Sequence, residues 1–288
     1  MLSDDPLRAA ATDNGLVDGW QGARLRHRAE LDLRVSHRDA VRRMGAEIDL
    51  GEPGLPRVVG CFLLVSVLAT VLEFAHLGTT PTARELADSG GVYAGALATG
   101  DWWAVITANL LHGSISHVAI NAFIIYLAGR WAERLAGRGL MVAVIAWSIV
   151  GTSVGALLLD PRVVSVGASG VAFGILGCAL VIDPKARTLA GTIARTFAII
   201  NIITTFLVPG ISVGGHLGGL AAGALVALVG WSRTPSDGHP LGAPRRLAMP
   251  VAAGLGAALL AALALFDVML PDTAARWGEV AALWFVSH

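Results

Sequence analysis

The stretch GASGVAFGILGCALVI, residues 167–182, carries no charged side chain and is followed at once by Asp183 and Pro184. A helix over residues 169–182 would have fourteen residues, which cover about 21 Å at about 1.5 Å per residue. The hydrocarbon core of a bilayer is about 30 Å thick. If Asp183 marks one edge of that core, Ser169 lies about 9 Å below the opposite surface. A helix that starts so deep must face protein and water rather than lipid.

Six further stretches are apolar and nearly free of charge, and most approach the roughly 20 residues that a membrane-spanning helix needs. They are 58–77, 113–129, 140–159, 196–208, 214–231 and 248–270, and the fourth of these is expected to begin upstream, near Leu189. With 169–182 they make seven spans. The composition agrees, because 55% of the residues are hydrophobic and 15% are charged, whereas about a quarter are charged in soluble domains. The sequence therefore predicts an all-α, polytopic membrane protein.

The basic residues indicate how these spans are oriented. Of the 21, most precede the first span or lie between the second and third, the fourth and fifth, or the sixth and seventh spans. The opposite side receives only Arg84, Arg162 and Arg276. Because short cytoplasmic loops are rich in Lys and Arg, we expect the N-terminus in the cytoplasm. A single lysine beside abundant alanine, glycine and arginine further suggests the plasma membrane of a bacterium.

The N-terminal segment, residues 1–56, shows no catalytic or binding motif. Residues 1–56 are polar and are expected to form a solvated helix or a tail, while 233–247 is a cytoplasmic linker and 271–288 an extracytoplasmic tail. The formal net charge is zero, so no basic surface predicts a nucleic-acid partner. Cys61 and Cys178 lie inside apolar stretches and suggest neither a disulfide framework nor a metal site. The oligomeric state is left open.

Two loops are expected at the outer surface of the membrane. Residues 78–111 contain Tyr93, Trp102 and Trp103 among small residues, and such aromatic rings favour the membrane interface. Residues 160–168 lead into Ser169. Because the following helix starts below the surface, we expect this second loop to be re-entrant or buried.

Polar side chains are costly inside hydrocarbon, so each one is a candidate for a functional site. Four lie near the outer ends of the second, fourth and sixth spans: His117, Asn121, Ser169 and His216. The first two are four positions apart and therefore share a helix face. Glu73, His76 and Asp267 lie near span ends, where we expect their side chains to reach the headgroups.

Glycine recurs at every fourth position on the fourth and sixth spans, at Gly170 and Gly174 and at Gly215, Gly219 and Gly223. This spacing lets two membrane helices approach closely. We therefore expect the serine-bearing and histidine-bearing spans to pack within side-chain hydrogen-bond distance.

A serine and a histidine in contact are the minimum set for acyl transfer, because the imidazole can accept the hydroxyl proton. We assign Ser169 as nucleophile and His216 as general base. Glu73 and Asp267 are expected at the headgroups, so no acidic residue is evident inside the membrane to orient His216, and we expect a dyad rather than a triad. The available donors for an oxyanion are the side chains of Asn121 and His117 and the backbone N–H of Ser169.

Three motifs resemble those of the rhomboid family of intramembrane serine proteases: HGSISHVAIN at 112–121, GASG at 167–170 and GGHLGG at 214–219. The resemblance covers about 58–231. It implies a six-helix rhomboid core over 57–232, with 248–270 as the extra helix of a 6+1 arrangement. It also implies an endopeptidase that cleaves single-span transmembrane proteins within or near the bilayer, without metal or cofactor.

The resemblance assigns the same roles to the serine and the histidine and adds supporting positions. These are His112 at the mouth of the second span, Gly167 and Gly170 around the serine, Gly215 beside the histidine, and Phe173. Phe173 replaces a tyrosine that packs on the histidine, so we expect the packing to remain. Glu133 and Arg134 match a cytoplasmic cluster that we take as structural. The family's Trp-Arg pair in the outer loop is Trp103-Ala104 here, which affects the expected stability of the loop but not the chemistry.

Two other interpretations compete with a protease. A catalytically silent rhomboid-like protein would bind membrane clients without cutting them, but such relatives typically lack the serine or the histidine, and this chain keeps both. A transporter is expected to show inverted repeats and interrupted spans in both halves, and the sequence shows neither pattern.

Overall fold

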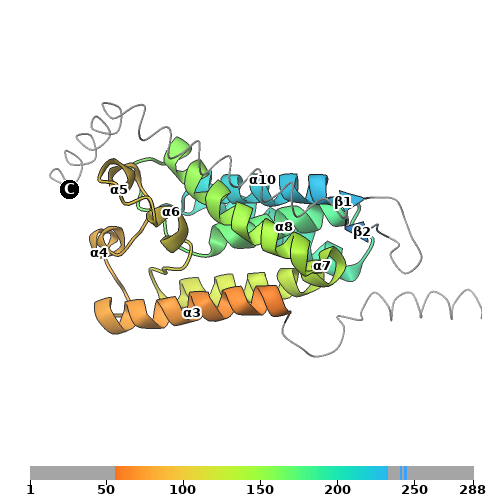
Figure 1. Cartoon of the computed structure of the whole chain (residues 1–288), viewed down its shortest axis with the longest axis horizontal. Coiled ribbons are helices and arrows are strands. Elements are labelled where there is room, and N and C mark those ends of the chain that lie inside the picture. Colours follow the sequence, from red (N-terminus) through yellow and green to blue (C-terminus); the bar gives the residue numbers. More distant parts are fainter. Residues whose placement is uncertain (1–55, 233–240, 242, 245–288) are drawn as a thin grey trace, which may run out of the picture. The chain divides into compact units, whose positions relative to one another are not determined.

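The computed structural model describes residues 56–232, 241 and 243–244, and these residues form mainly helices (Figure 1). The elements are α3 (Arg57–Leu77), α4 (Ala83–Asp88), α5 (Ala94–Ala98), α6 (Ala104–Thr107), α7 (Ile115–Leu159), α8 (Ser169–Ile182), α9 (Leu189–Leu207), α10 (Val213–Gly230), β1 (Trp231–Ser232) and β2 (Ala243–Pro244). The two short strands pair antiparallel. The seventh span predicted at 248–270, the tail at 271–288, nearly all of segment 1–56 and most of linker 233–247 lie outside the described residues.

Four of the described helices are long and apolar enough to cross a membrane by length and composition: α3, α7, α9 and α10. α3 and α10 match the spans predicted at 58–77 and 214–231 to within one residue at each end. α9 begins at Leu189, the upstream start expected for the fifth span. The helix predicted at 169–182 is confirmed as α8.

The predicted second and third spans are joined in one element, α7, of 45 residues. A straight helix of that length would measure about 68 Å, more than twice the hydrocarbon core. The chain instead turns at Gly137, whose φ of 76° and ψ of 161° are non-helical and are open to glycine because it has no Cβ. Val105 lies shortly before α7 begins, and its carbonyl oxygen accepts a hydrogen bond of 2.7 Å from Ser153, near the end of α7. The two halves, 115–136 and 138–159, therefore run in opposite directions.

The first half of α7 extends beyond the apolar pattern, which stops at Gly129. The residues that follow, RWAERLA at 130–136, are mostly good helix formers, so the helix continues to Gly137. In this extension, Glu133 accepts hydrogen bonds from the N–H groups of Val58 and Val59 at 3.0 and 2.9 Å. These donors lie in the first turn of α3, where N–H groups have no intrahelical partner. Glu133 thus fastens the start of α3 to α7.

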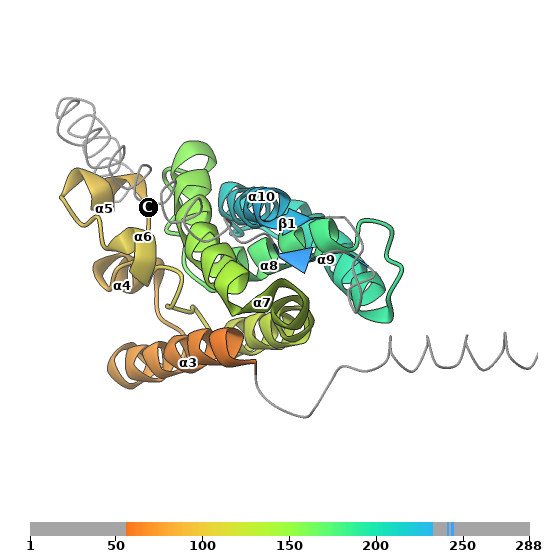
Figure 2. The same cartoon turned by 45° about the vertical axis from the view of Figure 1, so that its right-hand side comes forward.

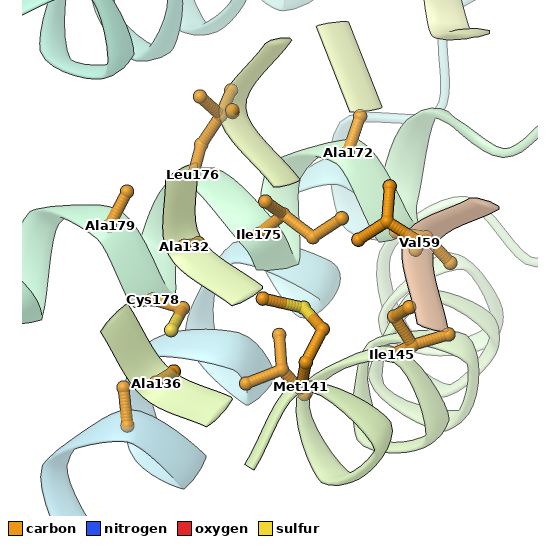
Figure 3. Close-up of a cluster of buried hydrophobic side chains, with 14 of the residues drawn as sticks. Val59, Ala132, Ala136, Met141, Ile145, Ala172, Ile175, Leu176, Cys178 and Ala179 are labelled. Atoms are coloured by element: carbon orange, nitrogen blue, oxygen red, sulfur yellow. The ribbon is translucent and has the colours of Figure 1, made fainter. Parts of the chain in front are cut away.

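α8 is the central helix and packs against α7, α9 and α10. All of its residues except Ser169 and Leu180 are buried, as expected of a short helix that faces protein. In Figures 1 and 2, α3 and α10 lie on opposite sides of α8. Figure 3 shows Ile175 and Cys178 of α8 in the buried apolar core beside Val59 of α3 and Met141 of α7.

Glycine allows α8 and α10 to touch through their backbones. A Cβ on Gly219 would clash with the carbonyl oxygen of Gly170, and a Cβ on Gly223 with that of Gly174. The four-residue spacing in the sequence therefore marks a helix contact. A second set brings α10 against α7 in the same way: Gly214 and Gly218 against Gly155 and Gly151.

The outer loop, residues 78–111, is held by apolar packing at the position where the family has an arginine. Ala104 is fully buried. It belongs to a small apolar cluster with Val92, Ala96, Ala108 and Ala156. The neighbouring rings of Trp102 and Trp103 are exposed and meet edge to face, with centroids 6.4 Å apart. Trp103 is therefore present, and Ala104, where the resemblance leads us to expect an arginine, is part of the apolar packing of this loop.

Candidate active site

Ser169 is the first residue of α8, and the two residues before it are tied to the outer loop. The N–H of Gly167 donates to the carbonyl oxygen of Ala108 at 2.8 Å. The N–H of Ala168 donates to Nε2 of His112 at 3.3 Å. Because the helix starts at Ser169, its backbone N–H belongs to the first turn, whose N–H groups lack an intrahelical acceptor.

The loop before the serine, residues 160–168, becomes more buried toward Ser169. Arg162 and Val163 are exposed, whereas Gly167 and Ala168 are buried. Midway, Ser165 exchanges two backbone hydrogen bonds with Val92 of the outer loop, at 2.9 and 3.1 Å. The two loops therefore support each other at the end of the bundle that carries the serine.

His216 lies near the start of α10, and that start is fixed by the end of α7. Ser212 caps the helix, since its Oγ accepts from the N–H of Gly215 at 2.9 Å. The same hydroxyl donates to Oδ2 of Asp160 at 2.8 Å, and the N–H of Gly214 donates to that oxygen at 2.6 Å. A carboxylate is favourable at the positive end of a helix, so Asp160 holds the turn that carries His216.

The structure brings Ser169 and His216 together, with Oγ and Nε2 2.8 Å apart. The contact crosses the place where α8 and α10 approach through glycine. Phe173, one turn after Ser169, is buried and stacks on the imidazole of His216. The ring centroids are 4.2 Å apart and the ring planes are inclined by 22°. The packing expected of Phe173 is therefore present without a tyrosine hydroxyl.

The other ring nitrogen of His216 contacts a residue that the sequence did not single out. Oγ1 of Thr205, on α9, lies 2.7 Å from Nδ1 of His216. Among the residues that the structure describes, no carboxylate forms a hydrogen bond with this imidazole. Thr205 is one of several threonines on α9 and lies eleven positions before the histidine, so no pattern in the sequence points to it.

His117 and Asn121, on α7, both approach Gly167. A Cβ on Gly167 would lie 2.6 Å from Cε1 and 2.7 Å from Nε2 of His117, and 3.5 Å from Nδ2 of Asn121. The φ of Gly167, +119°, also excludes most other residues. Nδ2 of Asn121 is buried and has no hydrogen-bond partner within the described part of the chain. An open, buried donor beside the serine loop can bind an oxygen atom of a ligand.

His112, in the segment between α6 and α7, supports the serine loop and contacts both of the neighbouring helices α3 and α7. Its ring is buried, with Nδ1 2.8 Å from Oγ1 of Thr70 and Nε2 accepting from the N–H of Ala168. The ring also meets that of His117 edge to face, with centroids 5.1 Å apart.

The expectation that Glu73 reaches the headgroups is wrong. Its carboxylate is buried because Oε2 accepts the backbone N–H of His112 at 2.8 Å.

One end of the bundle thus combines a hydroxyl, an imidazole and buried hydrogen-bond donors. An imidazole nitrogen 2.8 Å from a hydroxyl oxygen can accept its proton. Donors beside the serine can stabilise negative charge on an oxygen of a bound substrate. These groups are the ones that acyl transfer through a serine requires.

The chain is similar in sequence to known rhomboid proteins. The rhomboid domain model matches residues 99–233. The chain is 30% identical over 178 residues to the rhomboid protease GluP of Bacillus subtilis (strain 168), and the aligned part covers 60% of this chain and 35% of that protein. It is 31% identical over 175 residues to rhomboid-like protease 3 of Toxoplasma gondii, covering 58% and 64%. It is 30% identical over 138 residues to the putative rhomboid protease YdcA of Bacillus subtilis (strain 168), covering 46% and 69%.

The matched part of this chain spans less than two thirds of the length of the first two relatives. The rhomboid match, residues 99–233, includes the three sequence motifs and both residues of the serine–histidine contact. Four of the described helices are long and apolar enough to cross a membrane. The chain is a multi-pass membrane protein that belongs to the rhomboid family, several of whose members are named as proteases.

Proposed function

We propose that this protein is a serine endopeptidase that cleaves single-span transmembrane proteins within or near the bilayer. The observation that carries the proposal is the 2.8 Å separation between Oγ of Ser169 and Nε2 of His216. Relatives named as rhomboid proteases support the same activity. In this proposal Ser169 is the nucleophile, His216 is its general base, and the reaction uses no metal or cofactor.

The first half of the reaction forms an acyl-enzyme. The hydroxyl oxygen of Ser169 attacks the carbonyl carbon of the scissile peptide bond while Nε2 of His216 accepts the hydroxyl proton. The carbonyl oxygen gains negative charge, which the side chains of Asn121 and His117 and the backbone N–H of Ser169 stabilise. The protonated imidazole then donates its proton to the leaving nitrogen as the C–N bond breaks.

The second half of the reaction returns the enzyme to its starting state. A water molecule attacks the ester carbonyl carbon while His216 accepts one of its protons. The ester bond then breaks, and the proton passes to Oγ of Ser169 as the new carboxyl terminus leaves. Water must reach Ser169 past the loop 160–168, whose first part is partly exposed.

The proposed arrangement in the membrane has six spans in the core and one more beyond it. The six are α3, the two halves of α7, α8, α9 and α10, and the seventh is 248–270. Segment 1–56 lies in the cytoplasm, and the membrane is the plasma membrane of a bacterium. Large apolar side chains exposed on α3, α9 and α10 suit contact with lipid. Substrates meet the protein in the same bilayer.

The test is a cleavage assay with purified protein and a model single-span substrate reconstituted together in liposomes. We expect the wild type to release two fragments and Ser169→Ala to release none. Ser165→Ala is the matched control, since Ser165 lies in the loop that leads into Ser169 and its two hydrogen bonds to Val92 use only its backbone. It should cleave like the wild type.

The outcomes separate the candidate functions. Equal product from the wild type and Ser169→Ala would eliminate the serine mechanism. A folded wild type that binds the substrate without cutting it would favour the catalytically silent alternative, a rhomboid-like protein that binds membrane clients.

A further inference from the structure

We propose that Thr205 is a positioning residue that holds His216 in the tautomer required for proton transfer, an inference that rests on the proposed serine mechanism. Thr205 lies on α9 and is only 2% exposed. Its Oγ1 lies 2.7 Å from Nδ1 of His216 and 2.7 Å from the carbonyl oxygen of Asn201. One hydroxyl group therefore joins the imidazole to the backbone of α9.

The single hydroxyl hydrogen of Thr205 decides which nitrogen of His216 is protonated. A carbonyl oxygen only accepts hydrogen bonds, so a 2.7 Å contact between Asn201 and Thr205 requires the hydroxyl hydrogen to lie between them. The hydroxyl oxygen must then accept from Nδ1–H of His216. Nε2, 2.8 Å from Oγ of Ser169, is left without a hydrogen and is free to accept the serine proton.

A second threonine–histidine pair in the same protein has the same geometry and independently indicates the hydrogen positions. Oγ1 of Thr70 lies 2.9 Å from the carbonyl oxygen of Ser66 and 2.8 Å from Nδ1 of His112. Nε2 of His112 faces the N–H of Ala168 at 3.3 Å. An N–H only donates, so this Nε2 must be the unprotonated nitrogen. A helical threonine bonded to the carbonyl four residues before it thus leaves Nε2 as the acceptor.

A neutral hydroxyl suits this position better than a carboxylate. In soluble serine proteases a buried carboxylate orients the histidine, but a charged side chain inside the hydrocarbon region is costly. Thr205 supplies an acceptor for Nδ1–H without introducing a charge. Phe173 stacks on the face of the same imidazole, so the ring is restrained at both its face and its edge.

The test compares variants of the full-length protein in liposomes with one single-span substrate. Thr205→Val keeps the branched shape and removes the hydroxyl, whereas Thr205→Ser restores the hydroxyl. Thr204→Val is the matched control, because Thr204 also donates to the carbonyl oxygen of Asn201, at 3.0 Å, but among the described residues the hydroxyl bonded to Nδ1 of His216 is that of Thr205. We expect Thr205→Val to lower kcat about 10- to 100-fold and to change KM less than about twofold. Thr205→Ser should recover most of the activity, and Thr204→Val should match the wild type.

A spectroscopic measurement does not depend on the folding of the valine variant. In wild-type protein labelled with 15N at histidine, Nδ1 of His216 should give the shift of a protonated ring nitrogen and Nε2 that of an unprotonated one. The signals are assigned by their loss in His216→Ala. The reverse pattern of shifts would overturn the proposal.

The proposal can fail separately from the protease function. If Thr205→Val has the kcat of the wild type while Ser169→Ala is inactive, the positioning role is overturned and the serine mechanism stands. If the wild type and Ser169→Ala give equal product, both proposals are overturned.

Discussion

Ser169 and His216 are 47 positions apart in the sequence, yet their reactive atoms lie 2.8 Å apart. This distance is set by the packing of two helices, because the backbones of α8 and α10 touch where Gly219 meets Gly170. Catalytic geometry is sensitive to displacements of about 1 Å. A change in the helix contact should therefore affect the reaction even where it leaves both reactive side chains intact.

Gly219→Ala tests this dependence on helix packing. The added Cβ would clash with the carbonyl oxygen of Gly170 and lie 2.9 Å from Oγ1 of Thr152, so α10 must move away from α8. We expect kcat to fall about 10²-fold and the thermal midpoint to fall with it. Ala221→Val adds more volume on an exposed position of the same helix and should leave both unchanged. Gly219→Ala with wild-type kcat would show that this contact does not set the site.

Asn121→Ala tests the proposed oxyanion donor. We expect kcat to fall about 10²- to 10³-fold, because the amide would stabilise charge that develops in the transition state. The folding yield should change little, since Nδ2 has no partner in the described part of the free protein. Ile120→Ala, at a neighbouring exposed position on α7, is the control. A turnover number equal to that of the wild type removes Asn121 from the oxyanion role.

Gly167→Ala tests the support of the serine loop. A side chain at this φ of +119° is strained, and the new Cβ would lie 2.6 Å from the ring of His117. We expect a loss of about 1–2 kcal/mol in the free energy of unfolding. We also expect kcat to fall by about tenfold or more, because a shift of the serine loop displaces the reactive atoms. Gly113→Ala is the control, since its Cβ would meet only Leu86, at 3.8 Å. A Gly167→Ala variant as stable and active as the wild type would contradict the close approach.

Glu133→Ala separates stability from catalysis. It leaves the N–H groups of Val58 and Val59 without their acceptor, and a buried donor without a partner costs about 1–3 kcal/mol. We expect a lower thermal midpoint, measured in detergent, and an unchanged kcat for the folded fraction. Asp88→Asn, at an exposed position, should unfold like the wild type. An unaltered midpoint for Glu133→Ala would mean that this carboxylate does not hold α3.

The helices could largely be predicted because runs of apolar residues mark membrane spans directly. α8 begins at Ser169 and α9 at Leu189, as the sequence indicates. The continuation of α7 through 130–136 was not predicted. A hydropathy pattern shows where the lipid ends rather than where the helix ends. The helix continues because its residues favour it and because Glu133 has partners on α3.

Candidate site residues could be predicted where a residue type is rare in a membrane or belongs to a motif. Histidines and asparagines inside a span are rare, which singled out His117, Asn121 and His216, whereas Ser169 was singled out because it opens a short, deep helix. Threonine is common in apolar helices, and only the rotation of α9 about its axis decides that Thr205 faces the imidazole. Glu73 turns inward for a similar reason, because its partner is a backbone N–H 39 positions away.

The most direct measurement is mass spectrometry of the protein in liposomes after reaction with a fluorophosphonate, a reagent that modifies activated serine hydroxyls. If His216 activates Ser169, the wild type should carry a single adduct, on Ser169, and His216→Ala should carry none. An adduct on a different serine, or equal modification of Ser169 with and without the imidazole, would contradict the proposed serine–histidine mechanism.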